Sequence, residues 1–266
     1  MMTKSSDDTN RPASPDGIPA ATLVIFRQSQ NGGPPELLMV TRSRKMSFAG
    51  GAAVFPGGRV DPEDYDLAEH LPGDLPIDEA AHRIAAIRET LEETGLVVGL
   101  TGRIDAEAAR NARQMLLDQR ALAPVLASMQ WTVDFSAILP FSRWFPKNEK
   151  LSRVFDTRFY CADLGTGAVD ITVDATENTK LYWITAQQAL DDADAGKLTL
   201  IYPTRRNLER LAQFADFGAA AASCTQFGAK MITPILEDRD GERWLSIRDD
   251  AGYPITGERL DSAMRG

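Results

Sequence analysis

The sequence predicts an α/β fold in which helices cover both faces of a mixed β-sheet. β-rich apolar runs alternate with segments of helical periodicity along most of the 266 residues. Turns containing glycine or proline separate these segments. A hydrophobic content of 43% with 25% charged residues allows a substantial core. We therefore expect one domain over 19–256 with insertions, preceded by a disordered leader over 1–18 and followed by a tail over 257–266.

The first half of the sheet is expected to begin with a hairpin around the polar turn at 28–33. A later strand runs into Pro56-Gly57-Gly58, a turn whose backbone can approach a ligand or metal closely. Residues 61–77 form a loop insertion, because 61–76 contain three prolines and many acidic side chains. Strands are expected at 20–26, 37–41, 52–55, 96–100, 135–141, 157–162 and 180–184.

Segments of helical periodicity account for most of the remaining chain. A helix is expected over 78–94, with Asp78 as its N-cap and Gly95 as its stop. The Ala- and Leu-rich stretch at 105–128 predicts two short helices broken near Pro124, a helical excursion from the sheet over about 105–130. Further helices are expected at 185–194 and from about Pro203, and a hairpin at 231–247 around Asp240-Gly241.

The helix over 78–94 is the candidate for a functional site, because its acidic residues recur at spacings of three and four. At about 100° per residue these carboxylates share one face, and apolar residues fill the opposite face. Like charges on adjacent turns repel, and a divalent cation would relieve that repulsion. A solvated acidic face is the alternative. The carboxylates are Glu89, Glu92 and Glu93, and the apolar residues are Ile84, Ile87 and Leu91.

Together with the glycine turn, this helix resembles the Nudix hydrolase family. The family signature runs from a glycine after a strand, through an outer glutamate, to Arg-Glu, Glu-Glu and Gly on one helix. The corresponding residues are Gly58, Arg88, Glu89, Glu92, Glu93, Gly95 and Leu96. An insertion separates Gly58 from Arg88, and the outer glutamate, counted back from Arg88, falls on Ala80 beside Glu79.

The interrupted signature also resembles the Nudix branch related to peroxisomal coenzyme A diphosphatases. Further matches lie at 153–160, at Glu177 before 181–185, and at Ser43 with Gly51 upstream of the glycine turn. The resemblance implies a Nudix-type α/β/α sandwich. It also implies hydrolysis of a diphosphate linkage in a small nucleoside diphosphate derivative. Coenzyme A or acyl-coenzyme A is the first expectation for the substrate, followed by NADH or ADP-ribose.

Phosphate chemistry assigns roles to the matched residues. Mg²⁺ or Mn²⁺ prefers oxygen ligands, which Glu89, Glu92, Glu93 and a carbonyl of Gly57 or Gly58 supply. The general base is Glu92, Glu93 or, as the resemblance favours, Glu177, with an exposed loop acid as the alternative. Arg88 either orients the glutamates or contacts phosphate. Arg42 and Arg44, with the backbone of Gly57, are the candidates for substrate binding.

Composition excludes several functions. The net charge of −9 argues against a general nucleic-acid binder. No stretch suits a membrane span, and no signal peptide is apparent, so a cytoplasmic setting is expected. Cys161 and Cys224 lack metal-ligand spacing, and His82 is expected on the helix surface.

Two other functions stay open at this point. A non-catalytic Nudix module would sense a nucleotide and regulate a partner, and another enzyme on this scaffold would do isomerisation. Aromatic residues that either pack in the core or line a substrate pocket are Phe48, Trp144, Phe145 and Tyr202. The oligomeric state is not predicted.

Overall fold

A computed structural model of the chain describes residues 17–29, 32–43, 49–146, 154–165 and 178–263. The expected leader lies outside the described residues up to residue 16. Within the described residues, the main sheet has eight strands in the order β10-β7-β8-β1-β2-β3, with β4 on β1 and β9 on β2. The strands are β1 (Ile18–Arg27), β2 (Glu36–Arg42), β3 (Ala53–Val54), β4 (Gly57–Arg59), β7 (Leu139–Trp144), β8 (Phe155–Asp163), β9 (Asn178–Thr185) and β10 (Met231–Ile232).

Strand β1 is the axis of this sheet. It runs parallel to β8 along its length, from Ile18 opposite Phe155 to Phe26 opposite Asp163. On its other edge it pairs antiparallel with β4 at its beginning and with β2 at its end. The sheet is therefore mixed, as expected. Because β4 and β2 occupy different parts of the same edge, the sheet forks between them.

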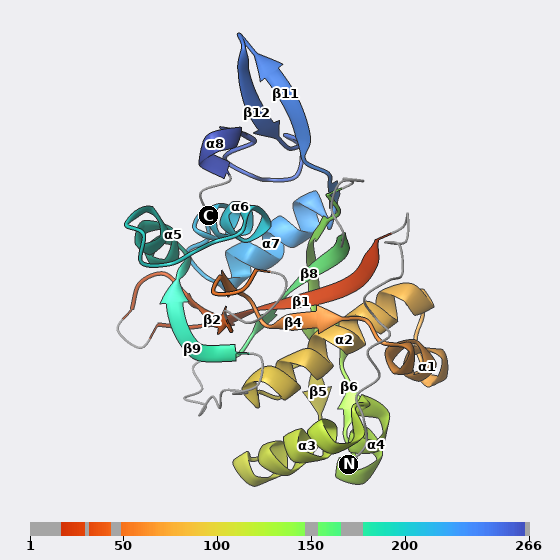
Figure 1. Ribbon diagram of the computed structural model, residues 1–266. Coiled ribbons are helices and arrows are strands. Elements are labelled where there is room, and N and C mark those ends of the chain that lie inside the picture. Colours follow the sequence, from red (N-terminus) through yellow and green to blue (C-terminus); the bar gives the residue numbers. More distant parts are fainter. Residues whose placement is uncertain (1–16, 30–31, 44–48, 147–153, 166–177, 264–266) are drawn as a thin grey trace, which may run out of the picture.

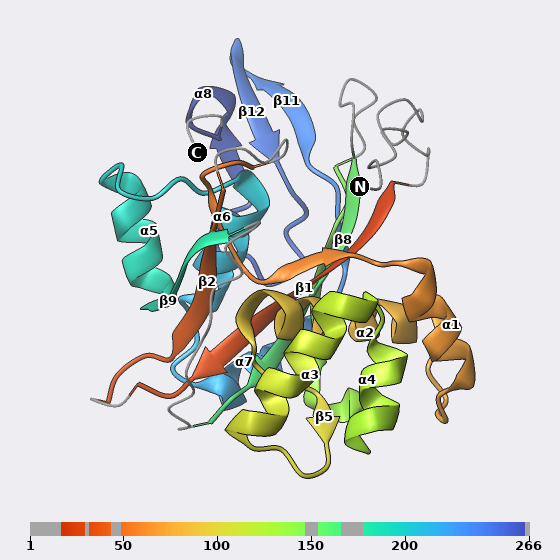
Figure 2. The same ribbon diagram turned by 60° about the horizontal axis from the view of Figure 1, so that its bottom comes forward.

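Helices cover both faces of the sheet (Figures 1 and 2). Alternate residues of β1 enter two different cores, with Leu23 and Ile25 in one and Val24 and Phe26 in the other. Both faces of β1 are buried for this reason, and the predicted α/β fold is confirmed. The first face carries α1 (Pro62–His70), α2 (Ile77–Thr94), α3 (Ala106–Gln119) and α4 (Leu122–Met129), and the second carries α5 (Ala186–Asp194), α6 (Tyr202–Leu211) and α7 (Phe217–Phe227).

Helix α2 follows the predicted periodicity. Ile84, Ile87 and Leu91 are fully buried in the first core. Gly95 ends the helix in the left-handed region at φ 76°, and its N–H donates to the Leu91 carbonyl oxygen. The predicted N-cap is wrong, because the cap is Pro76 and Asp78 lies in the first turn. Proline is suited to a helix start, where its missing N–H would have no helical acceptor.

The loop expected at 61–76 is wrong over most of its length, because it contains α1. The Asp64 carboxylate accepts from the Asp61 N–H at 2.9 Å in a capping box, and Pro62 occupies the first turn. The acidic and proline residues that suggested a loop are therefore helix-start signals. Near the other end of α2, the strand expected at 96–100 is reduced to β5 (Leu100–Thr101), which pairs with β6 (Thr132–Val133).

The helical excursion is confirmed, but its break is displaced. Helices α3 and α4 are separated at Arg120 and Ala121, and Pro124 lies in the first turn of α4, where proline is tolerated. The strand expected at 135–141 begins later, at β7, after a 3₁₀ turn (Phe135–Ala137). His82, expected on the surface, is 3% exposed.

The C-terminal part confirms α5, α6 and the hairpin of β11 (Ile235–Arg239) and β12 (Glu242–Ser246). Asp240 and Gly241 both have positive φ, as a tight two-residue hairpin turn requires. Helix α7 was not predicted. Inside the expected tail lie β13 (Gly257–Arg259), which pairs with β12, and α8 (Leu260–Ala263). Across the described residues, no helix is long and apolar enough to span a membrane.

Candidate active site

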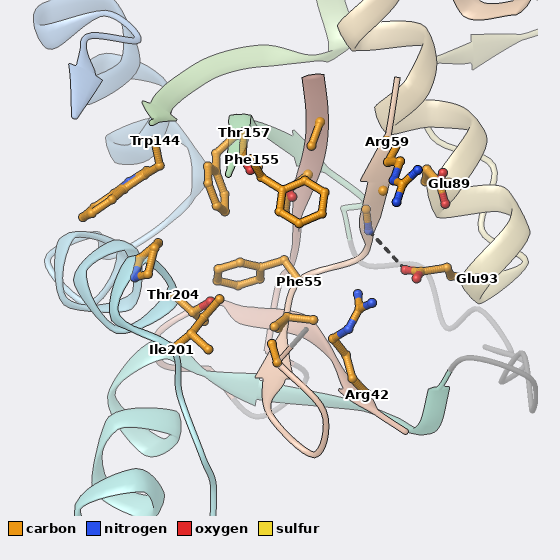
Figure 3. A pocket seen from close by; sticks show the side chains of 18 of the residues that line it. Arg42, Phe55, Arg59, Glu89, Glu93, Trp144, Phe155, Thr157, Ile201 and Thr204 are labelled. Carbon is orange, nitrogen blue, oxygen red and sulfur yellow. Dashed lines mark hydrogen bonds between the residues drawn. The ribbon is translucent and has the colours of Figure 1, made fainter. Parts of the chain in front are cut away.

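A cavity of about 460 Å³ opens at the fork of the sheet, between β4 and the β2–β3 edge (Figure 3). One end is polar and is formed by the acidic face of α2 and by β4. The other end is apolar, and aromatic side chains from three strands or turns reach it. The polar lining includes Arg42, Arg59, Asp61, Arg88, Glu89, Glu92, Glu93 and Arg120, and the apolar lining includes Phe55, Trp144, Pro146, Phe155, Phe159, Ile201 and Pro203.

The glycines of β4 let α2 approach the sheet closely. An ideal Cβ at Gly58 would lie 2.3 Å from the carboxyl carbon of Glu89, so any side chain there would displace this carboxylate. The Gly57 N–H donates to Glu93 at 3.1 Å, the contact drawn in Figure 3. Gly57 and Gly58 therefore form a cradle for two of the carboxylates, as the glycine turn suggested.

Glu89 has a perturbed carboxyl group. Burial, assisted by the charge of Glu92, raises the pKa of Glu89 to about 7, although Arg88 favours the charged form. The charged form of Glu89 is thus disfavoured despite Arg88, and further positive charge beside it would stabilise that form. An oxygen-preferring divalent cation would supply that charge, so the donor set fits Mg²⁺ or Mn²⁺.

The carboxylates have different hydrogen-bond partners, although the Arg88 Nη1 also lies 3.8 Å from Glu92. Glu93 accepts from the Gly57 N–H, Glu92 from Arg120 at 3.0 Å, and Glu89 from Arg88 at 2.9 Å. Within the described part of the chain, no three acidic, histidine or cysteine side chains already form a metal-binding group. An ion that bound Glu92 through Oε1, the oxygen that accepts from Arg120, would displace the Arg120 contact.

The NUDIX domain family model matches residues 17–201. The chain belongs to the Nudix family. A Xenopus laevis relative described as acyl-coenzyme A diphosphatase NUDT19 is 24% identical, covering 90% of this chain and 83% of its own. A Caenorhabditis elegans relative described as putative nudix hydrolase 7 is 26% identical over 79% of this chain and 64% of its own. The crystal structure of a NUDIX hydrolase from Alicyclobacillus acidocaldarius has a TM-score of 0.66 and 24% identity, and covers 78% of this chain and 96% of that one.

Family membership confirms the expected enzyme class, a Nudix-type diphosphatase that hydrolyses acid anhydrides in phosphorus-containing compounds.

The arginine of the Nudix signature, Arg88, forms a buried ion pair with Asp64. Arg88 is 3% exposed, and Asp64, on α1, is 1% exposed. Two parallel hydrogen bonds of 2.9 Å join the guanidinium to this carboxylate. Arg88 is thus held between Asp64 and Glu89, a geometry that favours the orienting role over contact with phosphate.

Asp64 is the outer acid that sequence reasoning missed. Counting back from Arg88 gave Ala80, which is buried in the apolar core, and its neighbour Glu79 pairs with Arg83 and Arg158 instead. Counting forward from Gly58 by the usual interval gives Asp64. The signal was therefore present, and the insertion lies after the outer acid rather than before it.

Helix α3 reaches the site through two arginines. Arg120 donates to the Glu92 carboxylate, and Arg113 donates to the Glu92 carbonyl oxygen at 2.9 Å. Neither contact had a signal in the sequence, because the two arginines lie in a segment far from the Nudix signature. Arg59 was also missed. It is exposed, and in Figure 3 its side chain lies next to Glu89.

The remaining predicted residues are distributed between wall, core and undescribed segments. Arg42 lines the cavity, and its buried Nε atom has no hydrogen-bond partner among the described residues. Arg44, Phe48 and Glu177 lie outside the described residues.

The aromatic candidates are partly wall and partly core. Trp144 is buried at the cavity wall, and its indole N–H is shared between Asn207 and Tyr253. Phe145 is buried away from the cavity lining, and Tyr202 packs edge-on against Trp144. The rings closest to the centre of Figure 3 are instead those of Phe55 and Phe155.

Proposed function

We propose that this Nudix protein hydrolyses the diphosphate linkage of a nucleoside diphosphate derivative with Mg²⁺ or Mn²⁺. The observation that carries the proposal is the shared cavity: Glu89, Glu92 and Glu93 line one end of it, beside the Gly57-Gly58 cradle. Glu89, Glu92 and Glu93, with a carbonyl of Gly57 or Gly58, would hold the cation. The cation would neutralise the charge that develops on phosphate oxygens and make the attacking water more acidic.

The protein residues divide the remaining work. Arg88 fixes Glu89 through the buried contact with Asp64, so the carboxylate is already in place before substrate binds. Glu93 or Glu92 accepts the proton of the attacking water, with Glu177 as the further candidate base from the sequence. Arg42 contacts phosphate, since its cavity position and its unpartnered Nε favour a bound anion. Arg44 remains a second candidate for this contact.

Coenzyme A or acyl-coenzyme A is the proposed first substrate, ahead of NADH and ADP-ribose. The X. laevis relative is described as an acyl-coenzyme A diphosphatase, and its similarity extends over most of both chains. The aromatic end of the cavity, formed by Phe55 and Phe155 among others, suits an adenine ring or an apolar acyl arm. Water would add to one phosphorus as the bridging P–O bond breaks, leaving a phosphate on each product. A cytoplasmic setting and the absence of general nucleic-acid binding remain predictions from composition.

The test is a panel of coenzyme A, acyl-coenzyme A, NADH and ADP-ribose, incubated with each metal and analysed by mass. We expect coenzyme A or its acyl form to give two phosphate-bearing products. Glu92→Gln combined with Glu93→Gln should lower the rate by about 10³-fold or more with the fold retained. Glu69→Gln, at an exposed carboxylate on α1, is the control and should change nothing. Unchanged turnover in the double variant rules the proposal out, and binding without product would indicate a sensing module.

A further inference from the structure

We propose that Arg120, at the end of the helical excursion, is a substrate-recognition residue that exchanges partners. Its guanidinium donates to the Glu92 carboxylate at 3.0 Å. When Glu92 turns to a divalent cation, the guanidinium binds a phosphate oxygen of the substrate. This inference rests on the proposed function and adds to it a residue outside the Nudix signature.

The end of helix α3 directs the Arg120 side chain toward the site. It is the C-cap of α3 in the left-handed region at φ 59°, and its N–H donates to the Leu116 carbonyl oxygen at 2.8 Å. Residues other than glycine seldom adopt this conformation, and those that do are enriched at functional sites. Leu116 and Ala112 are fully buried in the first core, so the helix that carries Arg120 is packed firmly. The position of the Arg120 backbone is therefore fixed.

The same helix is held in register with the carboxylate that Arg120 touches. The Arg113 Nε donates to the backbone carbonyl of Glu92 at 2.9 Å, so it contacts the same residue whose carboxylate accepts from Arg120. Helix α3 and its C-cap thus make two hydrogen bonds to Glu92, one to its backbone and one to its carboxylate. A phosphate held by a cation at Glu92 would lie within reach of the Arg120 side chain.

The Arg120 contact is suited to exchange, whereas that of Arg88 is not. The Arg88 side chain is 3% exposed and donates to Asp64, Glu89 and the Arg59 carbonyl oxygen. The Arg120 side chain is 74% exposed, and Nη1 is the atom that donates to Glu92. Exposed ion pairs are weak, and a guanidinium has five donors that match phosphate oxygens. Exchanging a carboxylate for a phosphate oxygen therefore costs little.

Exchange predicts two opposite changes when the guanidinium is removed. The cation would no longer compete with Arg120 for Glu92, so metal affinity without substrate should rise. Substrate would lose a charge-assisted contact, so its binding should weaken. A residue that only supported the fold would weaken both.

The experiment uses the full chain with Arg120→Ala, Arg120→Gly and Arg120→Lys. Glycine removes the same guanidinium but relieves the left-handed backbone, so equal effects of Ala and Gly assign the change to the side chain. The matched control is Arg110→Ala, because Arg110 is an exposed arginine on the same helix. The measurements are Mn²⁺ affinity by calorimetry without substrate, ADP-ribose affinity, and kcat and KM for ADP-ribose and coenzyme A.

We expect the Ala and Gly variants to raise KM about tenfold for both substrates, with kcat changed less than about threefold. Mn²⁺ affinity without substrate should rise about two- to fivefold. Lys should restore part of the KM, and Arg110→Ala should match the wild type. An unchanged KM, an unchanged or weakened Mn²⁺ affinity, or a loss confined to coenzyme A would overturn the proposal. If the wild type hydrolyses nothing, the proposed function fails, while the two binding measurements still decide the role of Arg120.

Discussion

Helices α1 and α3 contact the same helix, α2, in different ways. Helix α1 reaches α2 through Asp64 and Arg88, an ion pair whose side chains are 1% and 3% exposed. Helix α3 reaches it through Arg120 and Glu92, whose side chains are 74% and 12% exposed. Both contacts have an arginine and a carboxylate about 3 Å apart, so distance alone does not distinguish them.

Burial decides what each contact can do. A buried pair that loses one partner leaves a charge without solvent or counter-charge, so Asp64 and Arg88 stay together. An exposed pair exchanges readily with water, ions and ligands. We infer that α1 fixes the geometry of the Nudix helix, and that α3 supplies a side chain which responds to ligands.

The largest expected effect is that of Asp64→Ala. Removing this carboxylate leaves the Arg88 guanidinium buried without its bidentate partner, and the free energy of unfolding should fall by about 3–5 kcal/mol. Urea denaturation followed by circular dichroism measures the loss. Asp66→Ala, at an exposed position of the same helix, is the control and should stay within about 0.5 kcal/mol of the wild type. A loss no larger than that of the control would show that α1 does not hold Arg88.

A smaller effect is expected in the first half of α2, where His82 is buried. Its Nδ1 lies 2.6 Å from the Asp78 carbonyl oxygen, and its surroundings include the Asp78 and Glu79 carboxylates and the Arg158 guanidinium. Burial is the main cause that lowers the pKa of His82 from 6.5, and the Arg158 charge acts in the same direction.

The unfolded chain therefore binds a proton at His82 more readily than the folded chain does. The stability that this group contributes is present above about pH 6.5 and is lost as the pH falls below it. The free energy of unfolding of the wild type and of His82→Asn is measured by denaturation between about pH 7.5 and about pH 5.5. It should fall more steeply with decreasing pH in the wild type. Groups such as Glu89, whose raised pKa acts with the opposite sign, contribute equally to both proteins. Parallel curves would contradict the prediction.

The smallest effect is the coupling between Arg120 and Glu92. A double-mutant cycle with Arg120→Ala and Glu92→Gln should give a coupling free energy below about 1 kcal/mol, because the arginine is mostly exposed. The corresponding cycle with Asp64→Ala and Arg88→Met should give several times that value. Equal couplings would remove the distinction between the α1 and α3 contacts.

Local patterns predicted the buried face and the end of α2 well. The spacing of Ile84, Ile87 and Leu91 fixed the buried face of α2, and Gly95 marked its end, because both signals act within a few residues. The acidic face and the glycine cradle came from the same local reading. Glu89, Glu92 and Glu93 accordingly line one cavity, while their roles in catalysis remain to be tested.

Contacts between distant segments were beyond such patterns. The capping signal of Asp61 and Asp64 is local, but it was interpreted as a loop because prolines and acidic residues surround it. The Arg120 contact depends on where α3 packs against α2, which no local spacing encodes. The apolar end of the cavity likewise combines Phe55, Phe155 and Ile201, which are far apart in the chain.

The central claim is that three glutamates of α2 converge on one cation beside Gly58. The most direct measurement is an anomalous difference map from crystals grown with enough Mn²⁺ to support turnover. The account predicts a single strong peak bounded by oxygens of Glu89, Glu92 and Glu93, with the Arg120 guanidinium moved away from Glu92. A map with no peak among these carboxylates, and with Arg120 still on Glu92, would contradict it.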